Sequence, residues 1–345
     1  MAAGAPLTDA QWTAAVHDRL REVVPGLVPG HPAVAAIHRI AEDVWRLDLS
    51  DGGRVVAKHQ LQGLLTRGEP HDLVRLEVEV LRHLRRRGSP VPAAFGADPE
   101  SQTILLEYVG PRTLAEVLPG ETDRCVRRRW LARVWSGIGC IEWALSGGEW
   151  EGRVAPGASR QDLERSWERA GEDAVRVLRA LVLSDGAAAS SAEGLLRRLH
   201  RRLARFPACL GPTDYQPGNI VVDAGGVRLT FLELSKIGWD WTPRRAVQYT
   251  SIADAEGPAE TCLLDPGSLA GCGLDEGSRS CLDGHHLIYH LLLAGRWRRD
   301  GAGALPPPLA RKLIEPLSAD PLTVELRRRL GANHTLSFQD RPRER

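Results

Sequence analysis

Asp214, Asn219 and Glu233 are the residues whose types and spacing best suit chemistry in this chain. They lie in or beside a predicted β-hairpin, because two apolar runs, Ile220–Val222 and Val227–Leu232, flank an Asp-Ala-Gly-Gly turn. Antiparallel pairing of these runs brings Asn219 and Glu233 to the same end, with Asp214 a few residues outside. Amide and carboxylate oxygens gathered in this way suit a hard cation such as Mg²⁺, which takes few protein ligands.

A second hairpin and a helix are predicted to bring a cation and a carboxylate together. The hairpin covers residues 41–58 and places Lys58 near the end of its second strand. Apolar residues at helical spacing predict a helix over residues 71–87. Periodicity alone does not separate the two carboxylates of this helix, Glu77 and Glu79, so one interpretation is that both are surface charges. Glu77 lies on the apolar side and is the candidate to pair with Lys58.

The remaining pattern predicts an α+β chain in two lobes. An N-terminal helix is expected to end before Pro25, and a strand begins at Thr103 and runs into a crossing segment that ends at Gly110. Beyond it the apolar spacing is mostly helical. Helices are expected around residues 113–118, 126–145, 163–181, 195–206, 287–297, 308–317 and 323–330, with loops at 147–160 and 184–192. The predicted divisions are an N-terminal helical extension (1–30), an N-lobe (31–110), a C-lobe (111–333) and a disordered tail (334–345).

Composition excludes several classes of protein. The 345 residues are 43% apolar, which is ample for a core, and 45 basic against 44 acidic side chains leave a net charge of +1. This balance argues against nucleic acid or an anionic membrane as a partner. No apolar run is long enough to cross a membrane, and no signal peptide is expected at the start. The six cysteines form no Cys-x-x-Cys pair, which predicts reduced thiols in a cytoplasmic protein.

Three histidines, His285, His286 and His290, lie close together, two of them at i, i+4 spacing. This spacing can bind a metal, but no glutamate stands where a zinc-protease helix needs one. Structural histidines with satisfied hydrogen bonds are the favoured interpretation.

The order of these elements resembles the aminoglycoside phosphotransferase and choline kinase branch of the protein-kinase-like folds. The spacing from Asp214 to Asn219 is that of a kinase catalytic loop, and this loop is the most specific part of the resemblance. The resemblance covers roughly residues 35–295 and implies a two-lobed kinase-like fold, with a small antiparallel-sheet N-lobe carrying one helix and a larger, mostly helical C-lobe. Further similar stretches are the lysine strand Val55–Lys58, the helix Leu76–Leu84, Pro90–Pro92, the hinge Ile104–Gly110 and the helix Thr113–Leu118.

The resemblance also implies roles for individual residues. ATP or GTP is the implied phosphate donor, with Mg²⁺ as its metal. Asp214 is the implied catalytic base, and Asn219 and Glu233 are the implied metal ligands. The implied nucleotide-binding residues are Lys58, Glu77, Glu107, Tyr108 and Val109.

Three stretches depart from the family pattern. Pro212-Thr213 stands where His-Gly normally precedes the catalytic aspartate, and no glycine lies in Ile40–Val44, where a loop would cover phosphates. Glu233 replaces the metal-binding aspartate, and Gly238 keeps the family spacing after it. A glutamate reaches one methylene further than an aspartate and so displaces a metal that demands strict octahedral geometry.

The implied acceptor is a hydroxyl group, of an aminoglycoside-like antibiotic, of another small natural product, or of Ser/Thr in a biosynthetic precursor peptide of the lanthipeptide type. The acidic segment 253–283 favours a cationic acceptor, with a merely exposed loop as the alternative. A partner enzyme of a biosynthetic pathway is a further implied partner. The altered motifs motivate another function: a pseudokinase, which binds a nucleotide or a partner without turnover.

Overall fold

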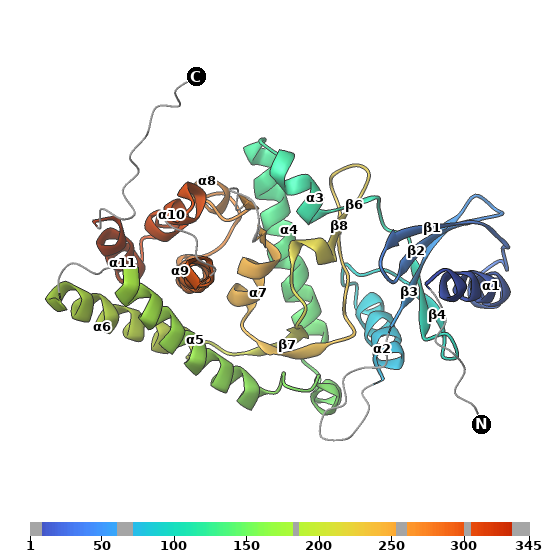
Figure 1. Cartoon of the computed structure of the whole chain (residues 1–345), viewed down its shortest axis with the longest axis horizontal. Helices are drawn as coiled ribbons and strands as arrows, with labels where there is room; N and C mark the ends of the chain where they lie inside the picture. Colours follow the sequence, from blue (N-terminus) through green and yellow to red (C-terminus); the bar gives the residue numbers. More distant parts are fainter. Residues whose placement is uncertain (1–8, 61–71, 182–185, 253–260, 300–304, 333–345) are drawn as a thin grey trace.

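The computed structural model describes residues 9–60, 72–181, 186–252, 261–299 and 305–332, and these form a sheet-rich N-lobe and a larger helical C-lobe (Figure 1). The N-lobe sheet is antiparallel, with the order β1-β2-β3-β5-β4. Its strands are β1 (Val34–Ala41), β2 (Val44–Leu49), β3 (Arg54–His59), β4 (Ala94–Asp98) and β5 (Thr103–Glu107). The predicted hairpin and central strand are confirmed, whereas the two edge strands, β1 and β4, were not predicted.

Two helices cover the two faces of this sheet. Helix α2 (Leu73–Arg86) packs with Ile104 and Leu106, and helix α1 (Asp9–Leu27) packs with the opposite face, where Trp45 and Leu105 lie. The predicted end of α1 before Pro25 is wrong. The helix continues to Leu27, and the next turn is held by burial of two valines and by a 2.9 Å hydrogen bond from the amide of Val28 to the carbonyl of Val24. The N-lobe therefore carries two helices.

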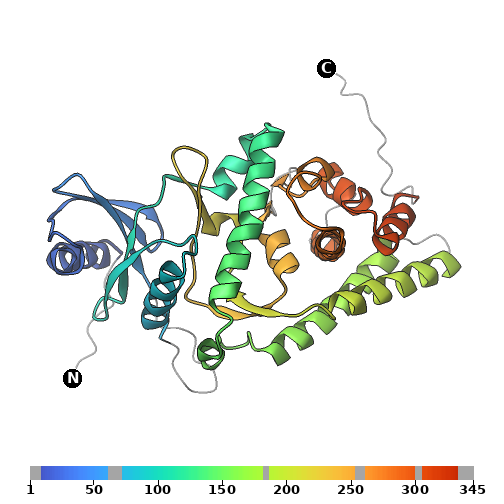
Figure 2. The ribbon, with the colours of Figure 1, turned by 180° about the vertical axis from the view of Figure 1, so that it is seen from behind.

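The C-lobe is built around α4 (Arg124–Ala144), which runs through its middle (Figure 2). The other helices are α3 (Leu114–Val117), α5 (Arg160–Leu181), α6 (Gly186–Leu203), α7 (Thr242–Tyr249), α8 (Pro266–Leu269), α9 (Glu276–Arg299), α10 (Pro307–Ile314) and α11 (Pro321–Gly331). Short 3₁₀ turns occupy Leu118–Gly120, Gly148–Arg153 and Pro217–Asn219. The predicted helices are present, but α6 extends back into the stretch 184–192 that was predicted to be a loop, and its alanine-rich start favours helix.

The predicted hairpin of the C-lobe is confirmed, with a shorter second strand than expected. Strands β8 (Ile220–Val222) and β9 (Leu229–Phe231) pair antiparallel, and β6 (Arg112–Thr113) joins β8. A second pair, β7 (Cys209–Pro212) with β10 (Ile237–Asp240), was not predicted, and it flanks the loop that carries Asp214. A short third pair joins β11 (Ser251–Ile252) to β12 (Thr261–Cys262).

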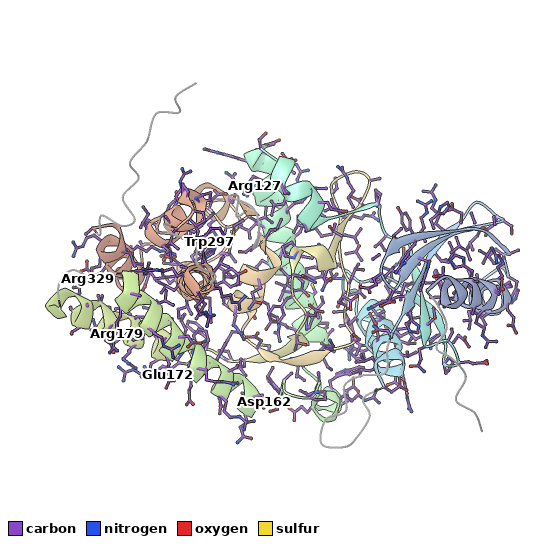
Figure 3. The ribbon with its side chains drawn as sticks, viewed as in Figure 1. Arg127, Asp162, Glu172, Arg179, Trp297 and Arg329 are labelled. Carbon is purple, nitrogen blue, oxygen red and sulfur yellow. The ribbon has the colours of Figure 1, made fainter. Side chains whose placement is uncertain are left out.

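The charge of Arg127, near the start of α4, is compensated by nearby carbonyl groups. Arg127, labelled at the start of α4 in Figure 3, is an unfavourable cation against the helix dipole. Its guanidinium donates hydrogen bonds to the carbonyls of Cys262 and Glu121, which compensates for that position. None of the six cysteines, all of which are among the described residues, forms a disulfide. Among the residues described, none of the helices combines the length and the apolar character that spanning a membrane requires. The predicted disordered tail lies outside the described residues.

Candidate active site

Lys58 and Glu77 meet in the interior of the N-lobe, as predicted. Strand β3 places Lys58 between Val44 of β2 and Ile104 of β5, and α2 presents Glu77 from the adjacent face. The Nζ of Lys58 lies 3.1 Å and 3.0 Å from the two carboxylate oxygens of Glu77, which is only 1% exposed. Glu79 instead forms ion pairs at the surface with arginines. The helix face, left open by the sequence, is thereby settled in favour of Glu77.

Glu233 provides a second carboxylate to the same lysine. Its Oε1 lies 2.8 Å from the Nζ of Lys58, a contact between the two lobes that the sequence did not predict. Burial opposes the charge of Lys58, yet the carboxylates of Glu77 and Glu233 raise the pKa of Lys58 above its ordinary value. The lysine is therefore a cation at neutral pH. The backbone of Glu233 has φ of 57°, in the left-handed region that non-glycine residues rarely adopt and that often accompanies functional sites.

The loop between β7 and β8 carries Asp214 and Asn219. The Nδ2 of Asn219 donates a 2.8 Å hydrogen bond to the carbonyl of Asp214, and the amide of Leu232 donates to the carbonyl of Asn219. These bonds tie the loop to the strand end that precedes Glu233, as the predicted hairpin register requires. Among the contacts between described residues, none engages the carboxylate of Asp214, which is half-buried.

A buried arginine, Arg245, binds the two strands that flank this loop. Arg245 of α7 is fully buried, and its guanidinium donates to the carbonyls of Pro212, Cys209 and Gly238, on both strands that flank the loop. Its charge is balanced by Glu142 of α4. Sequence reasoning missed Arg245. Its spacing of four residues from two apolar aromatic residues, Trp241 and Tyr249, was the available signal, because all three share one helix face.

Of the predicted hinge residues, Glu107 ends β5, and Tyr108 and Val109 follow it toward the C-lobe. They line a pocket of about 510 Å³ whose other walls come from α4 and the β8–β9 hairpin. Lys58, Asp214 and Asn219 are not among the residues that line it. The hinge side chains are therefore outside the cluster around Lys58. The carboxylate of Glu107 instead accepts a 3.0 Å hydrogen bond from the amide of Ala93.

The donor set near Asp214 fits Mg²⁺. Asn219 uses its amide nitrogen in the loop, which leaves its amide oxygen as a ligand, and Glu233 supplies carboxylate oxygens. These are hard oxygen ligands, and Mg²⁺ is usually bound by one or two such side chains together with phosphate oxygens and waters. Among the described residues, no three His, Cys, Asp or Glu side chains cluster to form an all-protein metal cage. His286 and His290 are buried with their ring centroids 4.0 Å apart and their planes tilted by 40°, and Arg327 approaches His286.

Comparison with protein families matches residues 34–232 to the Phosphotransferase enzyme family, known as APH. The matched region is more than half of the 345 residues and contains the Lys58 strand, the Glu77 helix and the Asp214 loop. The chain belongs to this family. The match ends at Leu232, immediately before Glu233.

Solved structures similar to this chain include aminoglycoside phosphotransferases and a choline/ethanolamine kinase family protein. The GDP complex of aminoglycoside 2'-phosphotransferase-IIIa is 13% identical, with 91% of this chain and 98% of that chain covered and a TM-score of 0.49. A choline/ethanolamine kinase family protein from Mesorhizobium loti is 13% identical, with 92% and 99% covered and a TM-score of 0.46. The streptomycin–ATP complex of APH(2")-IIa is 8% identical, with 84% and 91% covered and a TM-score of 0.47. Comparison with curated protein sequences found no match. The two predicted lobes, a small antiparallel-sheet N-lobe and a larger, mostly helical C-lobe, are confirmed by the chain's own strand order and helices.

Proposed function

We propose that this phosphotransferase moves the γ-phosphate of ATP or GTP to a hydroxyl acceptor. One continuous series of contacts supports the proposal. Glu77 holds Lys58, Lys58 contacts Glu233, and a backbone hydrogen bond links the residue before Glu233 to Asn219. Asn219 in turn holds the loop of Asp214. A cation, two oxygen ligands and an uncommitted carboxylate are thereby gathered where the two lobes meet.

Each residue has a separate task in this proposal. Lys58, held by Glu77, binds phosphate oxygens of the nucleotide, and the backbone of Glu107–Val109 contacts the purine. Asp214 accepts the proton of the acceptor hydroxyl while the hydroxyl oxygen bonds to the γ-phosphorus and the bond to the bridging oxygen breaks, leaving the nucleoside diphosphate. Asn219 and Glu233 would hold Mg²⁺, which would neutralise phosphate charge. Most of the rate enhancement then comes from positioning and charge.

The acceptor is proposed to be a small natural product, including an aminoglycoside-like antibiotic, or Ser/Thr of a precursor peptide. A cationic acceptor gains no support from the described part of segment 253–283. There Asp265 and Asp275 cap helix starts, and Asp283 is buried against Arg327. Glu276 is exposed and pairs with Arg279. The other acidic residues of the segment, Asp254, Glu256 and Glu260, lie outside the described residues. The free cysteines fit the reducing conditions of the cytoplasm, where such enzymes meet ATP.

A second candidate is a pseudokinase that binds a nucleotide or a partner, such as an enzyme of a biosynthetic pathway, without turnover. The ion pair between Glu233 and Lys58 favours it, because phosphate must displace a carboxylate that already contacts the lysine. The replaced residues Pro212 and Thr213 before Asp214 are a second departure in the same place.

The test measures nucleotide binding by calorimetry and nucleoside diphosphate release, with and without Mg²⁺, against a panel of aminoglycosides, small alcohols and Ser/Thr peptides. Asp214→Asn should reduce turnover by about 10²- to 10⁴-fold while leaving nucleotide affinity unchanged. Glu164→Gln, at an exposed position of α5, is the matched control and should behave as wild type. Nucleotide binding without turnover on any acceptor, with turnover appearing in Glu233→Asp, would identify the pseudokinase. Absence of nucleotide binding would overturn both candidates.

A further inference from the structure

The carboxylate of Asp240 is buried at the end of β10, two residues before α7 begins. The residue is 1% exposed. Its Oδ1 accepts a 2.7 Å hydrogen bond from the amide of Trp241, the next residue. Its Oδ2 accepts hydrogen bonds from Nη1 of Arg244, at 2.9 Å, and from the phenol of Tyr215. A buried charge is costly unless it is paired and hydrogen-bonded, and these donors provide both.

Tyr215 directly follows Asp214 in the loop that leaves β7 beside α7 (Figure 1). Its ring meets the ring of Tyr249 edge-on, with the centroids 6.0 Å apart, while its phenol reaches Asp240. Because burial, and then the charge of Asp240, raise the pKa of Tyr215, the phenol keeps its proton and remains the donor. The side chain of Tyr215 therefore anchors the loop to the end of β10.

The peptide group that joins Asp214 to Tyr215 is held from both sides. The carbonyl of Asp214 accepts a 2.8 Å hydrogen bond from Nδ2 of Asn219. On the other side, the phenol of Tyr215 is fixed to Asp240. Among the described residues, none donates a hydrogen bond to the carboxylate of Asp214 itself. The direction of this carboxylate therefore depends on the backbone of Asp214, which the two contacts hold.

We propose that Tyr215 and Asp240 are positioning residues, which fix the backbone of Asp214 so that its carboxylate faces the acceptor hydroxyl. Neither residue contacts nucleotide or acceptor in this role, and both act through Asp214. The role rests on the proposed function, in which Asp214 accepts the proton of the acceptor. A misplacement of about 1 Å can cost about 10²-fold in rate, so a hydrogen bond at the neighbouring residue is enough to control turnover.

Tyr215→Phe tests this role, because it removes the phenol oxygen and keeps the ring that contacts Tyr249. It should lower kcat by about tenfold and leave the nucleotide affinity, measured by calorimetry, unchanged. In an Asp214→Asn background the same change should cause no further loss of residual turnover, because no base is left to position. An equal loss in both backgrounds would overturn the proposal, since Tyr215 would then act independently of Asp214.

Asp240→Asn tests the other partner of the hydrogen bond. It should also lower kcat, and the double variant with Tyr215→Phe should be no slower than the slower single variant, because one contact is removed in all three. Losses that multiply in the double variant would refute action through this contact. Tyr289→Phe, which removes a half-buried phenol from α9, is the matched control and should turn over as wild type does.

Hydrogen exchange of residues 213–219, followed by mass spectrometry without nucleotide, gives a measurement that does not need turnover. The amides of Thr213 and Asn219 donate hydrogen bonds in this stretch. Tyr215→Phe should speed their exchange by about tenfold and leave exchange in β2 and β3 unchanged. Exchange as slow as in wild type would overturn the proposal. A wild type that turns over no acceptor would instead count against the proposed function, and exchange alone would then decide whether Tyr215 holds the loop.

Discussion

The Nζ of Lys58 lies 2.8 Å from the Oε1 of Glu233, although the two residues belong to different lobes. Glu77, on α2 of the N-lobe, contacts the same ammonium at 3.0 Å. Two carboxylates therefore share one cation. Under the proposed function, nucleotide phosphate would use Lys58 fully only when Glu233 turns toward another cation, so we expect the length and charge of Glu233 to control phosphate binding.

Glu233→Gln should separate these two effects of charge. Without Mg²⁺, the affinity for ATP should rise by about fivefold, because phosphate no longer competes with the second carboxylate for Lys58. The gain in affinity on adding Mg²⁺ should shrink, because a carboxylate ligand is lost. Calorimetric titration of ATP in EDTA and in Mg²⁺ measures both changes. If neither differs from wild type, Glu233 has no part in nucleotide binding.

Gly137 allows α4 to pack closely against β9. A Cβ at this position would clash with Cε2 of Phe231, which is fully buried. Gly137→Ala should therefore lower the free energy of unfolding by about 1–3 kcal/mol through overpacking. Gly139→Ala, on the same helix with no heavy atom within 4 Å of its Cβ, is the matched control and should raise stability by up to about 1 kcal/mol. Urea unfolding of both variants checks this, and equal effects would contradict the packing account.

Replacing the buried Arg245 should destabilise strands β7 and β10, which flank the Asp214 loop. Arg245→Met leaves Glu142 charged and unpaired in the core, along with three carbonyls that lose a donor, and should lower the free energy of unfolding by about 3–5 kcal/mol. The double variant with Glu142→Gln removes the orphan charge and should recover part of the loss. The midpoints of chemical denaturation measure both. A double variant as unstable as the single one would show that the charge itself contributes little.

His285 should make the stability sensitive to acid. Burial lowers the folded-state pKa of His285 to about 3; Asp240 opposes this shift, and Arg244 and His200 add to it. The unfolded-state pKa is about 6.5. Between these two values the unfolded state binds a proton that the folded state does not. Stability is thus fully present above pH 6.5 and is lost as the pH falls toward about 3, at up to about 1.4 kcal/mol per pH unit. His285→Leu should flatten this part of the profile. Melting temperatures of wild type and His285→Leu, measured from pH 7 to pH 4, check this prediction. Parallel pH profiles for the two proteins would refute it.

The central strands of the N-lobe were predictable, and its edges were not. Strand β2 alternates strictly between half-buried and buried residues, and β3 alternates from Arg54 to Ala57, so their period is visible in the sequence. Strand β1 is half-buried or exposed along its whole length, and β4 contains Gly96 and follows a proline-rich turn. An edge strand is fixed by its hydrogen bonds to a neighbour, which leave little pattern in its own residues.

The candidate site shows the same division between local and distant causes. The hairpin that gathers Asn219 and Glu233 follows from local turn chemistry, and the pairing of Lys58 with Glu77 follows from apolar periodicity. The contact of Glu233 with Lys58 and the burial of Arg245 and His285 depend on how the lobes and helices pack. A sequence pattern that treats arginine and histidine as surface residues has no means to predict them.

The helix α1 has a practical consequence for producing the protein. The family region begins at Val34, so a protein cut to that region would lack α1 entirely. Trp45, Leu47 and Leu105, now covered by α1, would then face water, together with Asp98, whose ion pair with Arg19 would be lost. An apolar sheet face of this kind promotes self-association. Expression boundaries should therefore begin before residue 9, well outside the limits that family membership alone would suggest.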